Sequence, residues 1–108
     1  MPKSWQDFIG GIKDELGILA KEELIALVKD TRKDQESFIK RQGEKLELYL
    51  NQLATGKITK EQFEGYVQDI KDLTEMQALK MSVAAKTRAQ RLAKNIQRLI
   101  IDSLLKLI

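Results

Sequence analysis

Midway along the chain lies the stretch Ala54-Thr55-Gly56-Lys57-Ile58-Thr59-Lys60-Glu61-Gln62-Phe63, which predicts the end of one helix and the start of another. Gly56 lacks a Cβ and can adopt the left-handed conformation in which many helices end. Thr59 is a favourable N-cap, and Gln62 stands three residues later, where its side chain can complete a capping box. Ile58 and Phe63 occupy the two positions of a hydrophobic staple, which fixes the direction in which the chain enters the new helix. We therefore expect a sharp turn here.

The turn divides the chain into two halves of similar length, and both halves have the composition of helices. The 108 residues include one Pro, and apolar residues recur at helical spacing without the alternation that strands require. We predict an all-α fold, a long antiparallel helical hairpin that forms a single domain over residues 1–108. The first arm spans about 4–54, the turn 55–59 and the second arm about 60–108. A continuous second arm would be a rod about 70 Å long.

The first arm contains one section that interrupts its apolar pattern. Residues 29–36 are wholly polar, and Asp30 or Thr31 can cap a new helix there. Either the first arm bends near 29–31, or a continuous helix crosses a solvated section. The second arm has no Pro and no Gly after Gly65, so it is expected to be unbroken.

Pairing the two arms about the turn predicts which side chains meet. The expected neighbours are Tyr49 with Tyr66, Glu22 and Glu23 with the region of Arg91, Lys94 and Arg98, and Asp30 and Asp34 with the region of Lys80 and Lys86. Opposite charges at such positions favour one register of two antiparallel helices. Each exposed pair contributes less than about 1 kcal/mol, so the charges support the pairing only modestly.

The apolar surface is wider than one hairpin can bury. Between Ile18 and Val28 little of the helix circumference is polar, and the last ten residues include seven large aliphatic side chains. Two helices alone enclose almost no interior. We therefore predict that copies of the chain associate into a helical bundle, for which a dimer of hairpins is the simplest closed form. The predicted oligomer or partner interface consists of Ile18, Leu24, Ile25, Val28, Leu92, Ile96, Leu99, Ile100, Leu104, Leu105 and Ile108.

The second half of the second arm is basic. The cations predicted to contact an anionic surface are Lys80, Arg88, Arg91, Lys94 and Arg98. A basic amphipathic helix is typical of an element that lies on a membrane or in a partner's groove. The simpler alternative is that this face packs on the acidic first arm. Nucleic acid is not an expected partner, because no aromatic residue lies among these cations to stack on a base.

The composition argues against catalysis and against a bound metal or cofactor. The chain has no Cys and no His, which removes thiolate chemistry, the commonest general base and the commonest metal ligand. No phosphate-binding loop is present, and no base accompanies the few hydroxyl side chains. We therefore expect a non-enzymatic protein without cofactor or metal. No signal peptide or membrane-spanning segment is recognisable, so we expect a cytoplasmic protein, with peripheral membrane association as an alternative.

Three functions are open at this point. The first hypothesis is a homo-oligomeric assembly protein, and the width of the apolar faces favours it. The second is a peripheral membrane protein in which the basic residues meet anionic headgroups while the C-terminal aliphatic residues insert, with Trp5 at the interface. The third is an adaptor whose apolar surface is completed by a different protein in a hetero-complex, such as a secretion, phage or toxin-related partner.

Overall fold

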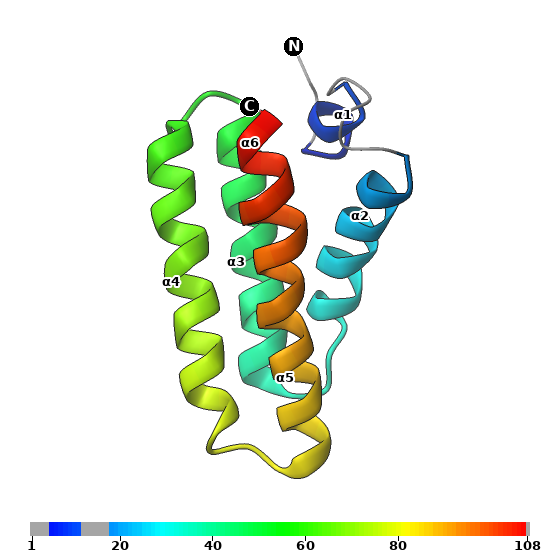
Figure 1. Ribbon diagram of the computed structural model, residues 1–108, viewed down its shortest axis with the longest axis vertical. Helices are drawn as coiled ribbons and strands as arrows, with labels where there is room; N and C mark the ends of the chain where they lie inside the picture. Colours follow the sequence, from blue (N-terminus) through cyan, green and yellow to red (C-terminus); the bar gives the residue numbers. More distant parts are fainter. Residues whose placement is uncertain (1–4, 12–17, 108) are drawn as a thin grey trace.

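The computed structural model describes residues 5–11 and 18–107, and the elements it contains there are helical (Figure 1). Their bounds are α1 Trp5–Gly10, α2 Ile18–Arg32, α3 Ser37–Ala54, α4 Lys60–Ala78, α5 Val83–Asn95, the π-helical segment η2 Ile96–Leu104, and α6 Leu105–Leu107. The all-α prediction is therefore confirmed for the described residues.

The chain leaves α3 through the left-handed conformation predicted at Gly56. The φ angle of Gly56 is 76°. The amide of Gly56 donates to the carbonyl of Leu53 at 3.2 Å, and the amide of Lys57 donates to the carbonyl of Gln52 at 2.8 Å. These two hydrogen bonds are those of a Schellman motif, which satisfies carbonyl groups at the end of the helix.

The start of α4 also follows the sequence. The Thr59 hydroxyl accepts a hydrogen bond from the Gln62 amide at 3.1 Å, and the Gln62 side chain accepts one from the Thr59 amide at 2.9 Å. Phe63 is fully buried, and Ile58 packs at the edge of the core. Further along the pair, Tyr49 stacks on Tyr66 with ring centroids 4.6 Å apart, as predicted.

The first arm is divided, which contradicts the simple hairpin. Helix α2 continues through residues 29–31 and ends at Arg32, so the predicted position of the bend is a few residues too early. Helix α3 starts after Glu36, whose side chain accepts a hydrogen bond from the Phe38 amide at 3.3 Å. The connection between the two helices is residues 33–36.

The second arm is divided as well, so the prediction of an unbroken helix over 60–108 is wrong. Helix α4 ends at Ala78, and α5 begins at Val83. Ser82 caps α5 by accepting a hydrogen bond from the Ala85 amide at 3.4 Å. Folding both arms back on themselves lets one chain bury apolar faces that two straight rods would leave in solvent.

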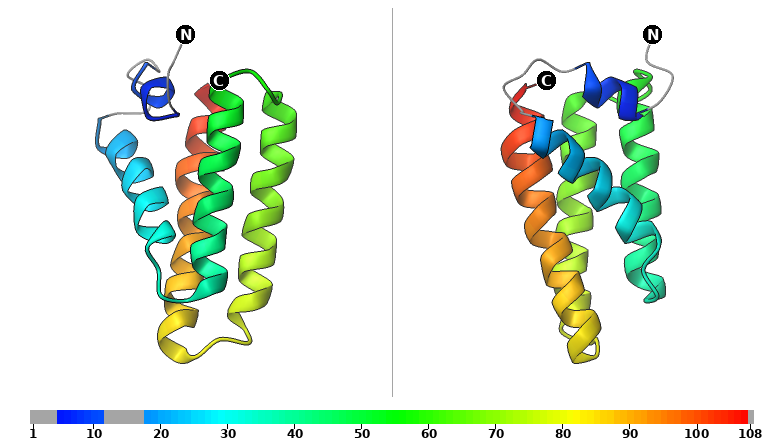
Figure 2. Two further views of the ribbon diagram at one scale, coloured as in Figure 1. Left: turned by 180° about the vertical axis from the view of Figure 1, so that it is seen from behind. Right: turned by 90° about the vertical axis from the view of Figure 1, so that its right-hand side faces the viewer.

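The result is a bundle in which α2, α3, α4 and the continuous helix α5–η2–α6 run alternately up and down (Figures 1 and 2). The longest dimension is 41 Å, far shorter than the rod expected from the sequence. The larger buried side chains come from every described helix: Trp5, Ile9, Leu24, Val28, Ile39, Leu46, Leu50, Phe63, Val67, Ile70, Leu92, Ile96, Leu99, Ile100, Leu104 and Leu105.

The last helix widens where its apolar arc is broadest. Over Ile96–Leu104 the backbone is a π-helix, which brings residues five apart into contact. The Ser103 hydroxyl accordingly donates to the carbonyl of Arg98 at 2.8 Å. Two pairs of adjacent side chains are both buried in this region, Leu99 with Ile100 and Leu104 with Leu105. One chain thus buries most of the C-terminal aliphatic residues.

Helix α1 is anchored on α3 by Trp5. This side chain is 1% exposed. Its backbone amide donates to Asn51 at 3.2 Å, and its indole N–H donates to Glu47 at 3.3 Å. Trp5 is therefore a core residue, which contradicts the expectation that it lies at a lipid interface. Among the helices of residues 5–11 and 18–107, none combines the length and apolarity needed to cross a bilayer.

Candidate functional site

The bundle is least tightly closed between α2 and the α5–η2 helix. Helix α2 packs extensively on α3 but only lightly on α5 and η2. Gly43 on α3 allows this approach: a Cβ there would lie 2.6 Å from the amide nitrogen of Arg32 and 2.8 Å from the carbonyl carbon of Thr31. Helix α2 is consequently inclined to the other helices (Figure 2, right). The inclination leaves an opening on the side that faces α5.

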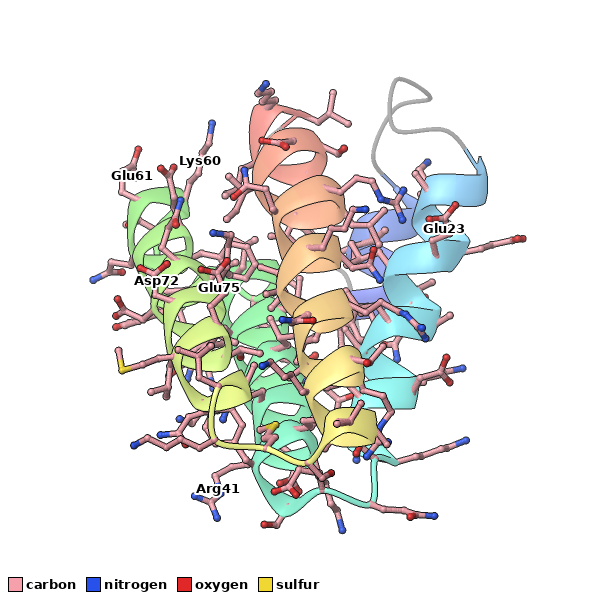
Figure 3. All side chains as sticks on the ribbon, turned by 60° about the horizontal axis from the view of Figure 1, so that its bottom comes forward. Glu23, Arg41, Lys60, Glu61, Asp72 and Glu75 are labelled. Carbon is pink, nitrogen blue, oxygen red and sulfur yellow. The ribbon has the colours of Figure 1, made fainter. Side chains whose placement is uncertain are left out.

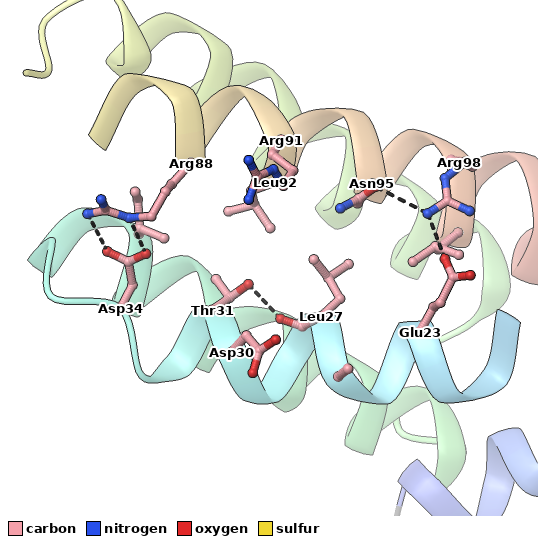
Figure 4. A pocket seen from close by; sticks show the side chains of 13 residues that line it. Glu23, Leu27, Asp30, Thr31, Asp34, Arg88, Arg91, Leu92, Asn95 and Arg98 are labelled. Atoms are coloured by element: carbon pink, nitrogen blue, oxygen red, sulfur yellow. Dashed lines mark hydrogen bonds and ion pairs between the residues drawn. The ribbon is translucent and has the colours of Figure 1, made fainter. Parts of the chain in front are cut away.

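A groove of about 290 Å³ occupies this opening (Figure 4). Its floor is made by Ile39, Leu92 and Leu99, which are almost fully buried. Leu27 is half-buried on the α2 wall, and Ala26 is exposed beside it. The groove is therefore apolar at its base and accessible from solvent, with a volume at the lower end of the range for ligand sites.

An ion pair crosses the groove at one end. Asp34, in the α2–α3 connection, accepts hydrogen bonds from Arg88 Nε at 2.8 Å and Arg88 Nη2 at 3.1 Å. The Glu36 amide donates to the same carboxylate at 2.9 Å. Burial alone would raise the pKa of Asp34. The hydrogen bonds from Arg88 and the Glu36 amide, with the positive charge of Arg88, outweigh that effect and leave the pKa below its ordinary value.

A second ion pair crosses the other end. Arg98 Nη2 lies 2.7 Å from Glu23 Oε2 and also donates to Asn95 Oδ1 at 3.3 Å. Both charged side chains are about half exposed. The prediction that Glu23 meets Arg98 is confirmed, whereas Asp34 pairs with Arg88 rather than with Lys80 or Lys86.

Opposite charges line the two walls near the middle of the groove. Arg91 lies on the α5 wall and Asp30 on the α2 wall (Figure 4). Both are exposed, and neither forms an ion pair within the described part of the chain. The Thr31 hydroxyl donates to the Leu27 carbonyl at 2.6 Å, so its proton is already engaged. The charged groups that a bound molecule would meet in the middle are therefore Arg91 and Asp30.

The apolar residues predicted to contact another chain lie mostly inside this one. Those that are buried are Leu24, Val28, Leu92, Ile96, Leu99, Ile100, Leu104 and Leu105. Ile25 is half-buried at the edge of the core. Ile108 and the side chain of Ile18 lie outside the described residues. The sequence assigned these residues to a surface, but a chain that folds into a bundle covers them itself.

The five predicted surface cations do not form one face. Arg88 and Arg98 are engaged in the two ion pairs across the groove. Arg91 points toward the groove, Lys94 is exposed on α5 outside it, and Lys80 is exposed in the α4–α5 turn. The alternative that this basic helix packs beside an acidic one describes Arg88 and Arg98 correctly.

Eight lining residues were not among the predicted site residues: Glu23, Ala26, Leu27, Asp30, Thr31, Asp34, Ile39 and Asn95. The predicted pairing of the two arms had named Glu23, Asp30 and Asp34. A further signal is helical spacing, since Ala26 and Asp30 lie four residues apart on α2, as Arg91 and Asn95 do on α5. No protein-family model matches this chain, and no curated protein and no solved structure is significantly similar to it. The site must therefore be interpreted from its own geometry.

Proposed function

We propose that this chain is a non-enzymatic interaction protein that binds a helix of a partner protein in the groove between α2 and α5–η2. The observation that supports the proposal is the incomplete packing of α2 on α5. In a closed bundle each pair of neighbouring helices interdigitates, whereas here Leu27, Leu92 and Leu99 line a hollow. Apolar side chains from an added helix would fill it.

The charges on the two walls define the partner. A helix lying in the groove would place one flank beside Arg91 and the other beside Asp30. The matching partner is an amphipathic helix with an apolar stripe, an acidic residue on one flank and a basic residue on the other. A helix with like charges on both flanks would meet repulsion at one wall.

This proposal corresponds to the adaptor hypothesis and changes the location of the contact. Self-association through the predicted apolar faces would require the bundle to open, because eight of those side chains are buried within one chain. The groove is open in the folded chain, and the two ion pairs join its walls at either end. A partner's apolar side chains would enter between these pairs.

Selection from a library of displayed helices tests the proposal. Each helix carries a fixed leucine stripe, with both flanks randomised among Glu, Lys and Gln. We expect the enriched helices to carry Glu on one flank and Lys on the other. Their addition should shift the methyl NMR signals of Leu27, Leu92 and Leu99. The absence of enrichment above an unselected library would contradict the proposal.

Charge-reversal variants test whether Arg91 and Asp30 on the groove walls contact the bound helix. Arg91→Glu should weaken binding of an enriched helix by about fivefold or more. Exchanging the two charges, with Arg91→Asp and Asp30→Arg together, should restore binding because the helix can lie in the opposite direction. Lys94→Glu makes the same charge change on α5 outside the groove and serves as the matched control. Equal losses in Arg91→Glu and Lys94→Glu would show a nonspecific charge effect and refute the site.

A further inference from the structure

The end of the bundle formed by the α4–α5 turn carries an exposed apolar patch. Five large hydrophobic residues are exposed in the described chain, and three of them lie within or beside this turn. They are Met76, Leu79 and Val83, with exposed fractions of 59%, 71% and 83%. Single exposed apolar residues are ordinary, but three so close together along the chain make this turn a candidate contact with another molecule.

The patch lies on a turn with a defined backbone. The amide of Lys80 donates to the carbonyl of Gln77 at 3.0 Å, and the amide of Met81 donates to that of Ala78 at 3.2 Å. Ser82 then caps α5. Met81 packs partly buried against the core, whereas its neighbours in the patch face solvent. The exposure therefore belongs to an ordered part of the fold.

Several exposed cations lie at the same end of the bundle as the patch. Lys80 is exposed in the turn itself. The α2–α3 connection and the start of α3 reach the same end (Figures 1 and 2), and Figure 3 labels Arg41 there. Their exposed cations are Lys33, Lys40 and Arg41. Of the acids at this end, Asp34 is paired with Arg88 and Glu75 with Lys71, while Glu36 is half-buried and accepts the Phe38 amide as the N-cap of α3.

We infer that this end of the bundle docks on an anionic lipid bilayer. Leu79, Val83 and Met76 would enter the headgroup region while Lys80 and the neighbouring cations contact lipid phosphates. A second copy of the chain is a poorer occupant, because a two-fold contact between two such turns brings Lys80 toward its own counterpart. The patch shares no apolar residue with the groove, so this docking is independent of the proposed helix binding.

Co-sedimentation of the full chain with vesicles tests the inference. Wild-type protein should bind vesicles of phosphatidylcholine with phosphatidylserine at least about tenfold more strongly than phosphatidylcholine alone, and salt should weaken that binding. Leu79→Ser with Val83→Ser should reduce binding about tenfold or more. Both positions are exposed, so folding should be retained. Leu48→Ser removes an apolar side chain of 49% exposure from α3 outside this turn and is the matched control.

A fluorescence measurement locates the contact. The single native Trp is buried at the other end of the bundle, so Leu79→Trp adds a reporter in the patch. Its emission should shift to the blue with phosphatidylserine vesicles and not with phosphatidylcholine alone. Equal binding to both vesicles, or unchanged binding of the Leu79→Ser/Val83→Ser variant, would overturn the inference. So would a dimer, formed without lipid, that this variant dissociates, because the patch would then belong to a second copy.

Discussion

Helix α5 meets α4 and α2 in two different ways. On α4 it packs closely, and the small residues Ala85, Ala89 and Ala93 recur along it in buried positions, with Ala78 buried at the end of α4. On the side that faces α2, Arg88 of α5 and Arg98 of η2 form ion pairs with acids across the groove. Small side chains permit close approach of helix axes, whereas long charged ones span a wider gap. The opening therefore results from the side chains along the continuous α5–η2 helix, together with the close packing of α2 on α3.

The close approach of α2 to Gly43 of α3 should be the contact most sensitive to substitution. Gly43→Ala should destabilise the protein by about 3 kcal/mol, because the new Cβ meets backbone atoms of Arg32 and Thr31 that cannot move independently. Urea unfolding followed by circular dichroism measures the change. Gly65→Ala is the control: it lies inside α4 with nothing within 4 Å of the added Cβ, so it should stabilise by up to about 1 kcal/mol. Similar effects of the two substitutions would show that helix propensity, and not the close approach, decides both.

Larger side chains on the two sides of α5 should have different effects at the close contact with α4 and at the open contact with α2. Ala89→Leu should destabilise by about 2 kcal/mol, because Ala89 is fully buried on the closely packed helix α5. Ala26→Leu adds the same atoms at the mouth of the groove, where they meet open space, and should change the stability by less than about 0.5 kcal/mol. Thermal unfolding of the two variants side by side is the measurement. A large loss in Ala26→Leu would mean that the groove closes in solution.

The central turn could be predicted from the sequence because its determinants are local. The bonds of Gly56, Thr59 and Gln62 all join residues within five positions of one another. The break at 79–82 has only Ser82 as a local signal, with neither Gly nor Pro. Whether a helix ends there depends on the apolar surface that can be buried by folding back, which is a property of the whole chain. The sequence therefore predicts the helices and one turn, and not the number of turns.

The same distinction applies to the site. The pairing of Glu23 with Arg98 follows from antiparallel order, which a hairpin and a bundle share for these segments. The groove depends on the inclination of α2, which depends on the space beside Gly43. In the sequence that glycine indicates only a weak point in a helix. Most residues of the predicted interface likewise belong to the core, because periodicity identifies an apolar face without identifying what covers it.

The smallest effect concerns the ion pair that closes one end of the groove. Asp34→Asn should destabilise by about 1 kcal/mol at neutral pH, because its partner Arg88 is partly exposed and solvent screens the pair. The pKa of Asp34 is lowered in the folded chain, so its contribution is complete above the unfolded value of about 3.9 and is lost as the pH falls through the folded value. The stability difference between wild type and Asp34→Asn should therefore be constant from neutral pH to about pH 5 and shrink below about pH 4. Urea unfolding across this pH range measures the stability difference. The comparison variant is Glu23→Gln, which removes the more exposed ion pair at the other end of the groove and should destabilise by only a few tenths of a kcal/mol at neutral pH. A difference that grows on acidification would show that Asp34 is stabilised as the neutral acid, and the bidentate contact with Arg88 could not then be what holds the α2–α3 connection against α5.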